Sequence, residues 1–512
     1  MNVEPAFDAF ESRYRSGAAQ VVWTRLVDDL ETPVSAYLKI GHGQPYAFLF
    51  ESVEGGAWRG RYSVITLGPD IVWRCHGEEA EIAEGADIPA GRFRPAGPTL
   101  DSLRDLVAAS RLDIPAGLPP MAAGVFGALG YDMVRLVEPV KDVPPDPLDL
   151  PDGVMVRPSI VAIFDGVAQE IILTTTVRSG TAPAREAYDA AIGRLAKVVA
   201  DLKKPTPPVA GDGQPLPDRF ETPVSRERYR DIVEQAKEYI RAGDIFQVVP
   251  SHRFRQPFPH DPFALYRSLR RTNPSPFLFY LNFGGFQLAG SSPEILVRLR
   301  DGKITIRPIA GTRPRGATPE EDRALEAELI ADPKERAEHL MLLDLGRNDV
   351  GRVAMLGQEG RNAPPPSPGQ TRAPHVRVTA SFFVERYARV MHLVSNVEGD
   401  APENVDPVDV LMAALPAGTL SGAPKVRAMQ IIDELEIEKR GIAYAGAVGY
   451  FGADGAVDTC IVLRTACFKD GVMYIQAGGG VVADSDPDAE YDETLHKARA
   501  LRDASEEAWR FV

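Results

Sequence analysis

The chain has 512 residues, 44% of them apolar and 25% charged, which is the composition of a globular protein with a sizeable core. At about 150 residues per domain, this length predicts three domains or two large ones. The net charge of −15 argues against nucleic acid and anionic membranes as partners. An anionic ligand would therefore need a local cluster of Arg, Lys and backbone N–H groups.

Cysteine usage and the amino terminus predict a cytoplasmic protein. The three cysteines, Cys75, Cys460 and Cys467, have no C-x-x-C spacing, which argues against a disulfide framework or a thiolate zinc site. The first residues lack the basic and apolar pattern of a signal peptide. No apolar run approaches the roughly 20 residues that a membrane span needs.

Two proline-rich stretches divide the chain. The first predicts an exposed linker at 203–223, between an amino-terminal domain at 1–202 and a larger domain at 224–512. The amino-terminal domain contains strand-like runs, such as 46–50 and 154–164, and few long helical patterns. The second stretch, at about 360–374, predicts a surface loop within the larger domain.

The larger domain opens with apolar residues at helical spacing from Tyr229 to Ile240, and Gly243 ends this helix. A strand-like run follows at 245–249. Thr318 and Asp332 each precede a proline and a glutamate in a pattern typical of helix starts. Short strands and helices then alternate without a βαβ rhythm. This pattern predicts an α+β fold in which antiparallel sheets pack with helices in layers.

A carboxylate lies in the apolar helical run at 338–345. Apolar residues occur all round this helix, so we expect it to be buried. Glu338 then needs either a basic partner such as Arg347 or a metal ion, because an unpaired buried carboxylate is costly. The residues alone favour neither alternative.

The carboxy-terminal helix places Glu490, Glu493 and Lys497 on one face. This face is either solvated, with a Glu493–Lys497 ion pair, or part of a metal site. In the second case Glu493 joins Glu338 around magnesium, with positions left for water and substrate oxygens. Oxygen ligands without cysteine favour magnesium over zinc.

Arg464 interrupts an apolar strand-like run and needs an anion, either a structural carboxylate or a substrate carboxylate. Gly478, Gly479 and Gly480 form either a tight turn or a segment whose backbone approaches a ligand closely. His392, in the apolar strand at 390–394, is by default a hydrogen-bonded core histidine, and the alternative is a general base.

The segment at 418–425 resembles a phosphate loop only superficially. It lacks the G-x-x-x-x-G-K-[ST] spacing, so we do not expect nucleotide binding. Pro424 opens a helix instead, which places Thr419 in the loop just before that helix.

Five motifs in one order resemble the chorismate-utilising enzymes, in particular the branch that forms anthranilate. They are Gly-Ser-Ser-Pro-Glu at 290–294, Pro-Ile-Ala-Gly-Thr-Arg-Pro-Arg at 308–315, and the segments at 337–348, 416–425 and 490–494. Together they cover nearly all of 225–505. The runs at 48–52 and 60–63 are similar to the amino-terminal domain of the same enzymes.

The resemblance implies that ammonia adds to ring carbon two of chorismate while the hydroxyl on carbon four leaves, and that pyruvate is then eliminated to give anthranilate. It implies His392 as the base, with Thr419 beside it, and Glu294 as the acid. Glu338 and Glu493 would bind magnesium, with Glu490 as an additional acidic contact. The implied chorismate contacts are Gly311, Thr312, Tyr444, Arg464, Gly478, Gly479 and Gly480, with Lys497 adding positive charge.

Two positions distinguish activities within the family. Relatives that form aminodeoxychorismate carry a lysine where this chain has Ala310, and relatives that add water carry one where it has Gln247. The absence of both lysines favours direct ammonia addition. The alternatives are an aminodeoxychorismate synthase component and, from another class, a non-catalytic subunit that binds an amino acid.

No cysteine lies on the glycine-flanked turn that a glutamine amidotransferase needs for its nucleophile. We therefore expect a separate amidotransferase subunit that supplies ammonia, in a heterotetramer. The resemblance also implies feedback inhibition by tryptophan, bound at Ser52 and at Pro276, Phe277 and Leu278. Phe277 and Leu278 replace the Tyr-Met of the family, which removes a hydroxyl but keeps the apolar volume.

Overall fold

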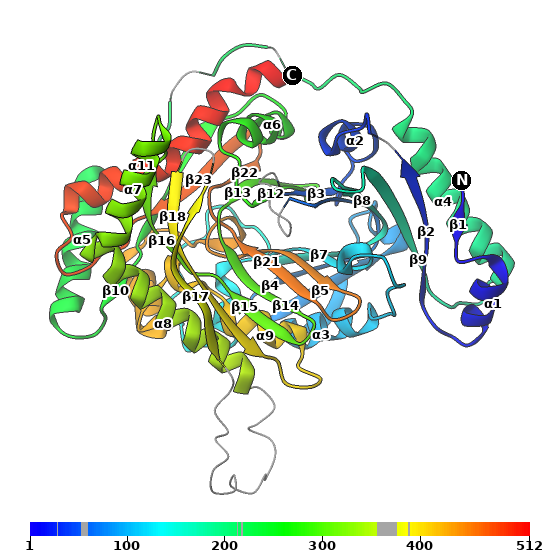
Figure 1. Ribbon diagram of the computed structural model, residues 1–512, viewed down its shortest axis with the longest axis horizontal. Coiled ribbons are helices and arrows are strands. Elements are labelled where there is room, and N and C mark those ends of the chain that lie inside the picture. Colours follow the sequence, from blue (N-terminus) through cyan, green and yellow to red (C-terminus); the bar gives the residue numbers. More distant parts are fainter. Residues whose placement is uncertain (28, 53–59, 212, 217–218, 356–375, 388–389) are drawn as a thin grey trace, which may run out of the picture.

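The computed structural model describes residues 1–27, 29–52, 60–211, 213–216, 219–355, 376–387 and 390–512 (Figure 1). The predicted surface loop at about 360–374 lies outside the described residues. The described part of the linker at 203–223 contains no helix after α4, and only Glu221 forms a strand bridge, to Arg255.

The strands before the linker are β1 (Val3–Glu4), β2 (Gln20–Val27), β3 (Phe48–Glu51), β4 (Tyr62–His76), β5 (Glu79–Glu84), β6 (Arg94–Pro98), β7 (Gly124–Leu129), β8 (Gly153–Asp165) and β9 (Glu170–Val177). The helices are α1 (Phe7–Arg15), α2 (Pro33–Ile40), α3 (Thr99–Ala109) and α4 (Ala184–Leu202).

The strands after the linker are β10 (Gln247–Val248), β11 (Ser251–Pro257), β12 (Phe277–Asn282), β13 (Gln287–Ser292), β14 (Ile295–Arg300), β15 (Lys303–Ile306), β16 (Ile309–Pro314), β17 (Arg377–Arg386), β18 (Val390–Asp400), β19 (Gly422–Ala423), β20 (Ala447–Gly452), β21 (Val457–Ile461), β22 (Thr465–Lys469) and β23 (Val472–Gly478). The helices are α5 (Arg226–Arg241), α6 (Pro262–Thr272), α7 (Pro319–Ala331), α8 (Pro333–Met355), α9 (Pro407–Ala414), α10 (Lys425–Leu435) and α11 (Pro487–Glu507).

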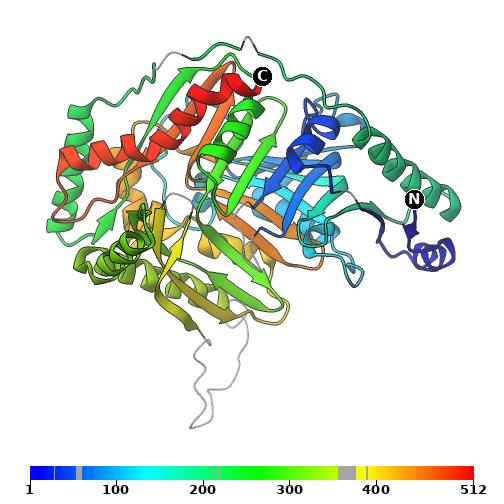
Figure 2. The same ribbon diagram turned by 45° about the horizontal axis from the view of Figure 1, so that its top comes forward.

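The described strands join in one continuous sheet of 21 strands, and β10 pairs separately with β19. Neighbouring strands run antiparallel throughout, for example β4 with β8 and β11 with β23. Helices lie around the outside of the strands, with α5, α6 and α11 on one side and α1 and α4 on another (Figures 1 and 2). The predicted α+β fold with antiparallel sheets is confirmed.

Strands from the two sides of the linker pair directly. Phe50 of β3 lies opposite Phe279 of β12, and Phe126 of β7 lies opposite Tyr450 of β20. The apolar core is shared in the same way, because one buried cluster contains both Phe10 and Tyr266. The division at 203–223 stays a prediction about chain organisation, and the packing across it is continuous.

Local signals located the helix starts well. α5 begins after Ser225, whose side chain accepts a hydrogen bond from the backbone N–H of Arg228. α7 begins after Thr318, whose side chain accepts from the N–H of Glu321, and α8 follows Asp332. The strand expected at 245–249 is shorter, and the 19-residue helix α4 has no counterpart among the predicted elements.

Two local predictions were wrong. The segment 338–345 is helical but not buried all round, because Leu340 is 52% exposed while Leu342 is buried. The strand expected to contain Arg464 ends at Ile461, and Arg464 lies in the connection to β22 with φ of 49°. A left-handed backbone cannot continue a strand. Among the described residues, no helix has the length and apolar character needed to cross a membrane.

Candidate active site

One cavity of about 210 Å³ gathers most of the predicted site residues. Its walls come from β16, β18 and β23, from helices α8 and α11, and from the turns around residues 419 and 464. The predicted residues that line it are Gln247, Glu294, Thr312, Glu338, His392, Thr419, Tyr444, Arg464, Gly478, Gly480, Glu490, Glu493 and Lys497. Segments that lie far apart in the sequence therefore meet at one point.

The acidic wall consists of Glu338 on α8 and of Glu490 and Glu493 on α11. Burial and the neighbouring carboxylates of Glu335 and Glu493 raise the pKa of Glu338. Burial, with a further contribution from Glu493, also raises the pKa of Glu490. Arg347 pairs with Asp344 at 2.9 Å instead of with Glu338. Repulsion among these carboxylates leaves a place where a cation would be stabilised.

Three buried polar atoms at the cavity have no hydrogen-bond partner among the described residues: Gln247 Oε1, Tyr444 Oη and Glu490 Oε2. Buried polar atoms without partners are costly, so these atoms are available to a ligand. No three acidic, histidine or cysteine side chains in the described ranges are close enough to hold a metal alone. A magnesium ion at Glu338 and Glu493 would therefore need oxygens from water or substrate.

Two of the predicted cationic residues, Lys497 and Arg464, line the same cavity. Lys497 Nζ forms an ion pair with Glu493 at 2.6 Å and donates to the carbonyl of Gly478 at 2.9 Å. Arg464 forms no ion pair with a described residue, and burial lowers its pKa. The nearby carboxyl group of Glu294 raises the pKa of Arg464, but no direct ion pair joins the two side chains. A substrate carboxylate would satisfy this guanidinium.

Glu294 and Thr419 line the cavity and are hydrogen-bonded to each other. Burial raises the pKa of Glu294 from its ordinary value of 4.5 to about 8, although Thr419 and Arg464 act in the opposite direction. Thr419 Oγ1 donates to Glu294 Oε2 at 3.3 Å. Thr419 lies in the short 3-10 helix η4 (Gly418–Leu420), ahead of α10 as predicted. A carboxyl group that keeps its proton at neutral pH can act as a general acid.

His392 of β18 also lines the cavity and is only 5% exposed. Its Nδ1 lies 3.1 Å from the carbonyl of Gly311 and 3.0 Å from the hydroxyl of Thr312. A carbonyl can only accept, so Nδ1 carries the proton and Nε2 offers its lone pair. Burial, together with Arg464, lowers the pKa of His392 to about 4, which keeps the imidazole neutral and able to accept a proton.

The three glycines permit close packing at the end of β23. A Cβ atom on Gly478 would lie 2.5 Å from the carbonyl oxygen of Pro250, and one on Gly480 would lie 2.7 Å from Gln247 Nε2. Gly479 does not line the cavity, and its N–H donates to Pro250. A Cβ there would lie 2.8 Å from Glu490 Oε2. The glycines thus permit close packing against Pro250, Gln247 and Glu490, and their approach to a ligand stays a prediction.

Some lining residues were not predicted. Lys334, on the first turn of α8, lines the cavity one turn before Glu338. The signal was present, since the pattern at 332–335 marked the helix start and i, i+4 spacing puts residues on one face. Ala310, the position that distinguishes relatives, also lines the cavity.

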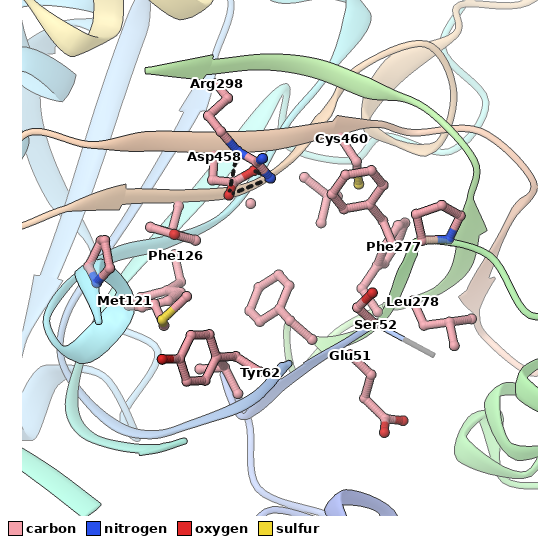
Figure 3. Close-up of a pocket in the computed structure, with 18 of the residues that line it drawn as sticks. Glu51, Ser52, Tyr62, Met121, Phe126, Phe277, Leu278, Arg298, Asp458 and Cys460 are labelled. Atoms are coloured by element: carbon pink, nitrogen blue, oxygen red, sulfur yellow. Dashed lines mark hydrogen bonds and ion pairs between the residues drawn. The ribbon is translucent and has the colours of Figure 1, made fainter. Parts of the chain in front are cut away.

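A second, larger cavity of about 530 Å³ contains the residues expected to bind tryptophan: Ser52, Pro276, Phe277 and Leu278. Figure 3 shows Tyr62, Met121 and Phe126 opposite them, with the Arg298–Asp458 ion pair at the edge. The carboxylate of Glu51 points away from this cavity and pairs with Arg270 at 2.8 Å (Figure 3).

A cavity lined by acidic side chains, by Lys and Arg side chains and by a carboxyl group of raised pKa is typical of an enzyme site that binds an anionic small molecule. The model of the chorismate binding enzyme family matches residues 47–362 and 370–503, and the chain belongs to this family. The chain is 55% identical to anthranilate synthase component 1 of Cereibacter sphaeroides, with 99% of this chain and 98% of that protein covered.

Two further relatives agree. The component 1 of Pseudomonas putida is 46% identical, with 92% of each chain covered. The crystal structure of anthranilate synthase component I from Streptococcus pneumoniae superposes with a TM-score of 0.73 at 34% identity, covering 93% of this chain and 98% of that one.

Proposed function

We propose that this chain is the chorismate-converting component of an anthranilate synthase, a lyase that forms anthranilate and pyruvate from chorismate and ammonia. The cavity of about 210 Å³ carries the proposal, because it combines an acid, a base, cationic side chains and carboxylates around one space. The relatives named anthranilate synthase component 1 support it along nearly the whole chain. We further propose a cytoplasmic location.

Glu338 and Glu493 are the proposed magnesium ligands, and Glu490 supports them. The raised pKa values of Glu338 and Glu490 and the partnerless Glu490 Oε2 suit a bound cation. When bound, magnesium supplies positive charge for the ring carboxylate of the substrate. Arg464 and Lys497 supply the remaining positive charge within a chain of net charge −15.

The proton transfers are assigned to two residues that line the cavity. Glu294 donates its proton to the hydroxyl that leaves ring carbon four, and Thr419 orients the carboxyl group. His392 removes the proton from carbon two, and the Gly311 carbonyl fixes its tautomer. Ala310 and Gln247 provide no lysine that could add to the ring or activate water. Ammonia therefore adds directly.

Ammonia is proposed to come from a glutamine amidotransferase subunit, with a heterotetramer as the assembly. Cys75, Cys460 and Cys467 are all buried, and burial raises the pKa of each thiol. A protonated, buried thiol cannot serve as the nucleophile that glutamine hydrolysis requires. The ammonia-releasing half of the reaction thus belongs to another chain.

Feedback inhibition by tryptophan is proposed for the cavity of about 530 Å³. Its aromatic and apolar walls suit an indole ring, and Ser52 Oγ and Arg300 Nε have no hydrogen-bond partner among the described residues. A small cavity bordered by Pro276, His392 and Arg464 lies between the two sites. Movement of the segment before β12 can therefore reach the active site.

The test is product formation by the purified chain. With chorismate, magnesium and ammonium, fluorescent anthranilate should appear without an added lyase, and glutamine should not replace ammonium. A product that needs a lyase to become aromatic would instead identify the aminodeoxychorismate activity, against which Ala310 argues. Binding of tryptophan without any turnover of chorismate would identify the non-catalytic alternative.

A further inference from the structure

Arg440 is fully buried just outside the active-site cavity, in the connection between α10 and β20. Its side chain is 1% exposed, and it pairs with Glu436, whose side chain is 2% exposed, at 2.5 Å. Neither residue lines the cavity. A buried Arg–carboxylate pair is often replaceable by apolar residues without loss of stability, so burial alone does not explain its presence.

The guanidinium group of Arg440 connects two walls of the active site. It donates to the carbonyl of Leu420 at 2.6 Å and to the carbonyl of Val249 at 2.6 Å. Leu420 follows Thr419 in η4, and Val249 lies two residues after Gln247. Both Leu420 and Val249 line the cavity. One rigid, planar group thus fixes the distance between these two segments.

The same guanidinium contacts a third wall through an aromatic ring. Its carbon lies 5.3 Å from the ring centre of Tyr444 and 4.8 Å from that of Tyr131, which belongs to the short helix η3 (Tyr131–Leu136). Tyr444 lines the cavity and its hydroxyl is without a partner among the described residues. Cation–π attraction holds this ring in place.

Glu436 extends the connection to a fourth wall. Its Oε1 accepts hydrogen bonds from the backbone N–H of Ser251 at 2.7 Å and from the Ser251 hydroxyl at 2.8 Å. Ser251 lies opposite Gly478 in the pairing of β11 with β23, and Gly478 lines the cavity. The ion pair therefore reaches the glycine segment as well.

We propose that Arg440 and Glu436 are positioning residues for chorismate conversion, which hold the segments of Thr419, Gln247, Tyr444 and Gly478 in register around the substrate. This inference rests on the proposed anthranilate-forming activity. The most sensitive consequence is at Thr419, because its hydroxyl orients the acid Glu294. A shift of η4 would weaken that hydrogen bond while leaving every group that contacts the substrate present.

The chain contains a matched control in Arg135. Arg135 also makes a bidentate ion pair with a carboxylate of α10, donating to Asp433 at 2.6 Å and 2.8 Å. Its other hydrogen-bond partners among the described residues are Asp132 and the carbonyl of Val140, and none of these residues lines the active-site cavity. A purely structural role for buried pairs at this helix predicts the same behaviour for both arginines.

The experiment compares Arg440→Lys and Arg440→Met with Arg135→Met, and measures kcat, KM for chorismate, the pH profile with ammonium, and thermal unfolding. We expect Arg440→Lys to lower kcat by about 10²-fold, the loss typical of reacting groups misplaced by about 1 Å. The hydrogen bond from Thr419 lowers the pKa of Glu294, so weakening it should raise this pKa. The basic limb of the pH profile of the variant should therefore move to higher pH. Arg135→Met should keep the wild-type kcat and pH profile.

A double variant, Arg440→Met with Glu436→Gln, keeps the test decisive if Arg440→Met alone does not fold. It leaves no charge at either position of this pair, and the glutamine can still accept from Ser251. A folded double variant that remains slow supports positioning, whereas one with wild-type kcat overturns it. Equal kcat losses in Arg440→Met and Arg135→Met would also overturn it. If the wild-type chain, assayed in parallel, forms no anthranilate, the proposed function itself fails.

Discussion

Replacement of Glu294 by glutamine should make the enzyme slower and, at neutral pH, more stable. The carboxyl group is 7% exposed, and burial raises its pKa from 4.5 to about 8. The folded state therefore binds this proton more tightly than the unfolded state does. The stabilisation that comes from binding this proton is fully present below about pH 4.5 and is lost progressively as the pH rises to about 8.

The magnitude follows from these two values. One pKa unit corresponds to about 1.36 kcal/mol. Compared with a side chain that stays protonated in both states, Glu294 therefore lowers the free energy of unfolding by about 1 kcal/mol at pH 5 and by about 3 kcal/mol at pH 7. The glutamine side chain of the variant does not titrate, and its amide oxygen can still accept from Thr419. The stability of Glu294→Gln relative to wild type should therefore rise by about 2 kcal/mol between pH 5 and pH 7.

The assay is urea unfolding of both proteins at pH 5, 6 and 7, because the difference between pH values cancels any constant effect of the amide. The exposed Glu79 of β5 provides the control, and Glu79→Gln should track wild type at each pH. Turnover by Glu294→Gln should fall by about 10²- to 10⁴-fold, the usual contribution of a general acid. Parallel stability curves for Glu294→Gln and wild type would refute the assignment of a buried, protonated Glu294.

Three further substitutions test the other groups. Glu493→Gln should raise the magnesium concentration needed for half-maximal turnover by at least about 10-fold. The melting temperature should not change. An unchanged magnesium titration would contradict the role of Glu493 as a ligand. Arg464→Lys should raise KM for chorismate by about 10- to 100-fold, because a bidentate charged contact is lost, and an unaltered KM would exclude it as the carboxylate contact. Ser52→Ala should weaken inhibition by tryptophan about 5-fold, as the loss of one hydrogen bond predicts, with kcat unchanged; equal inhibition of both proteins would remove Ser52 from the regulatory site.

Much of the site was predictable because its chemistry is carried by short segments whose structure is local. Thr419 precedes a helix that Pro424 opens, and Glu490, Glu493 and Lys497 share a helical face by spacing alone. His392 lies in a strand marked by apolar neighbours. In each case a cap, a proline or a hydrophobic period determines the local conformation.

Tertiary features were not predictable from these local signals. The left-handed backbone of Arg464 turns its side chain out of a strand pattern, and no neighbouring glycine marks that turn. Leu340 lies in an apolar run yet is half exposed, because only one face of α8 packs on the sheet. The hydrogen bonds of Arg440 join segments up to 191 positions apart. Such contacts depend on strand pairing that periodicity does not specify.

The proposed inhibition by tryptophan requires a connection between the two cavities. The wall of the larger cavity is formed where Glu51 of β3 lies opposite Leu278 of β12, so it needs residues from both sides of the linker. The residues just before β12, 273–276, border a small cavity together with His392 and Arg464. A ligand in the larger cavity changes the active site only if it binds two arrangements of this segment with different affinity. β12 pairs with both β3 and β13, whereas residues 273–276 lie between α6 and β12 and belong to no strand.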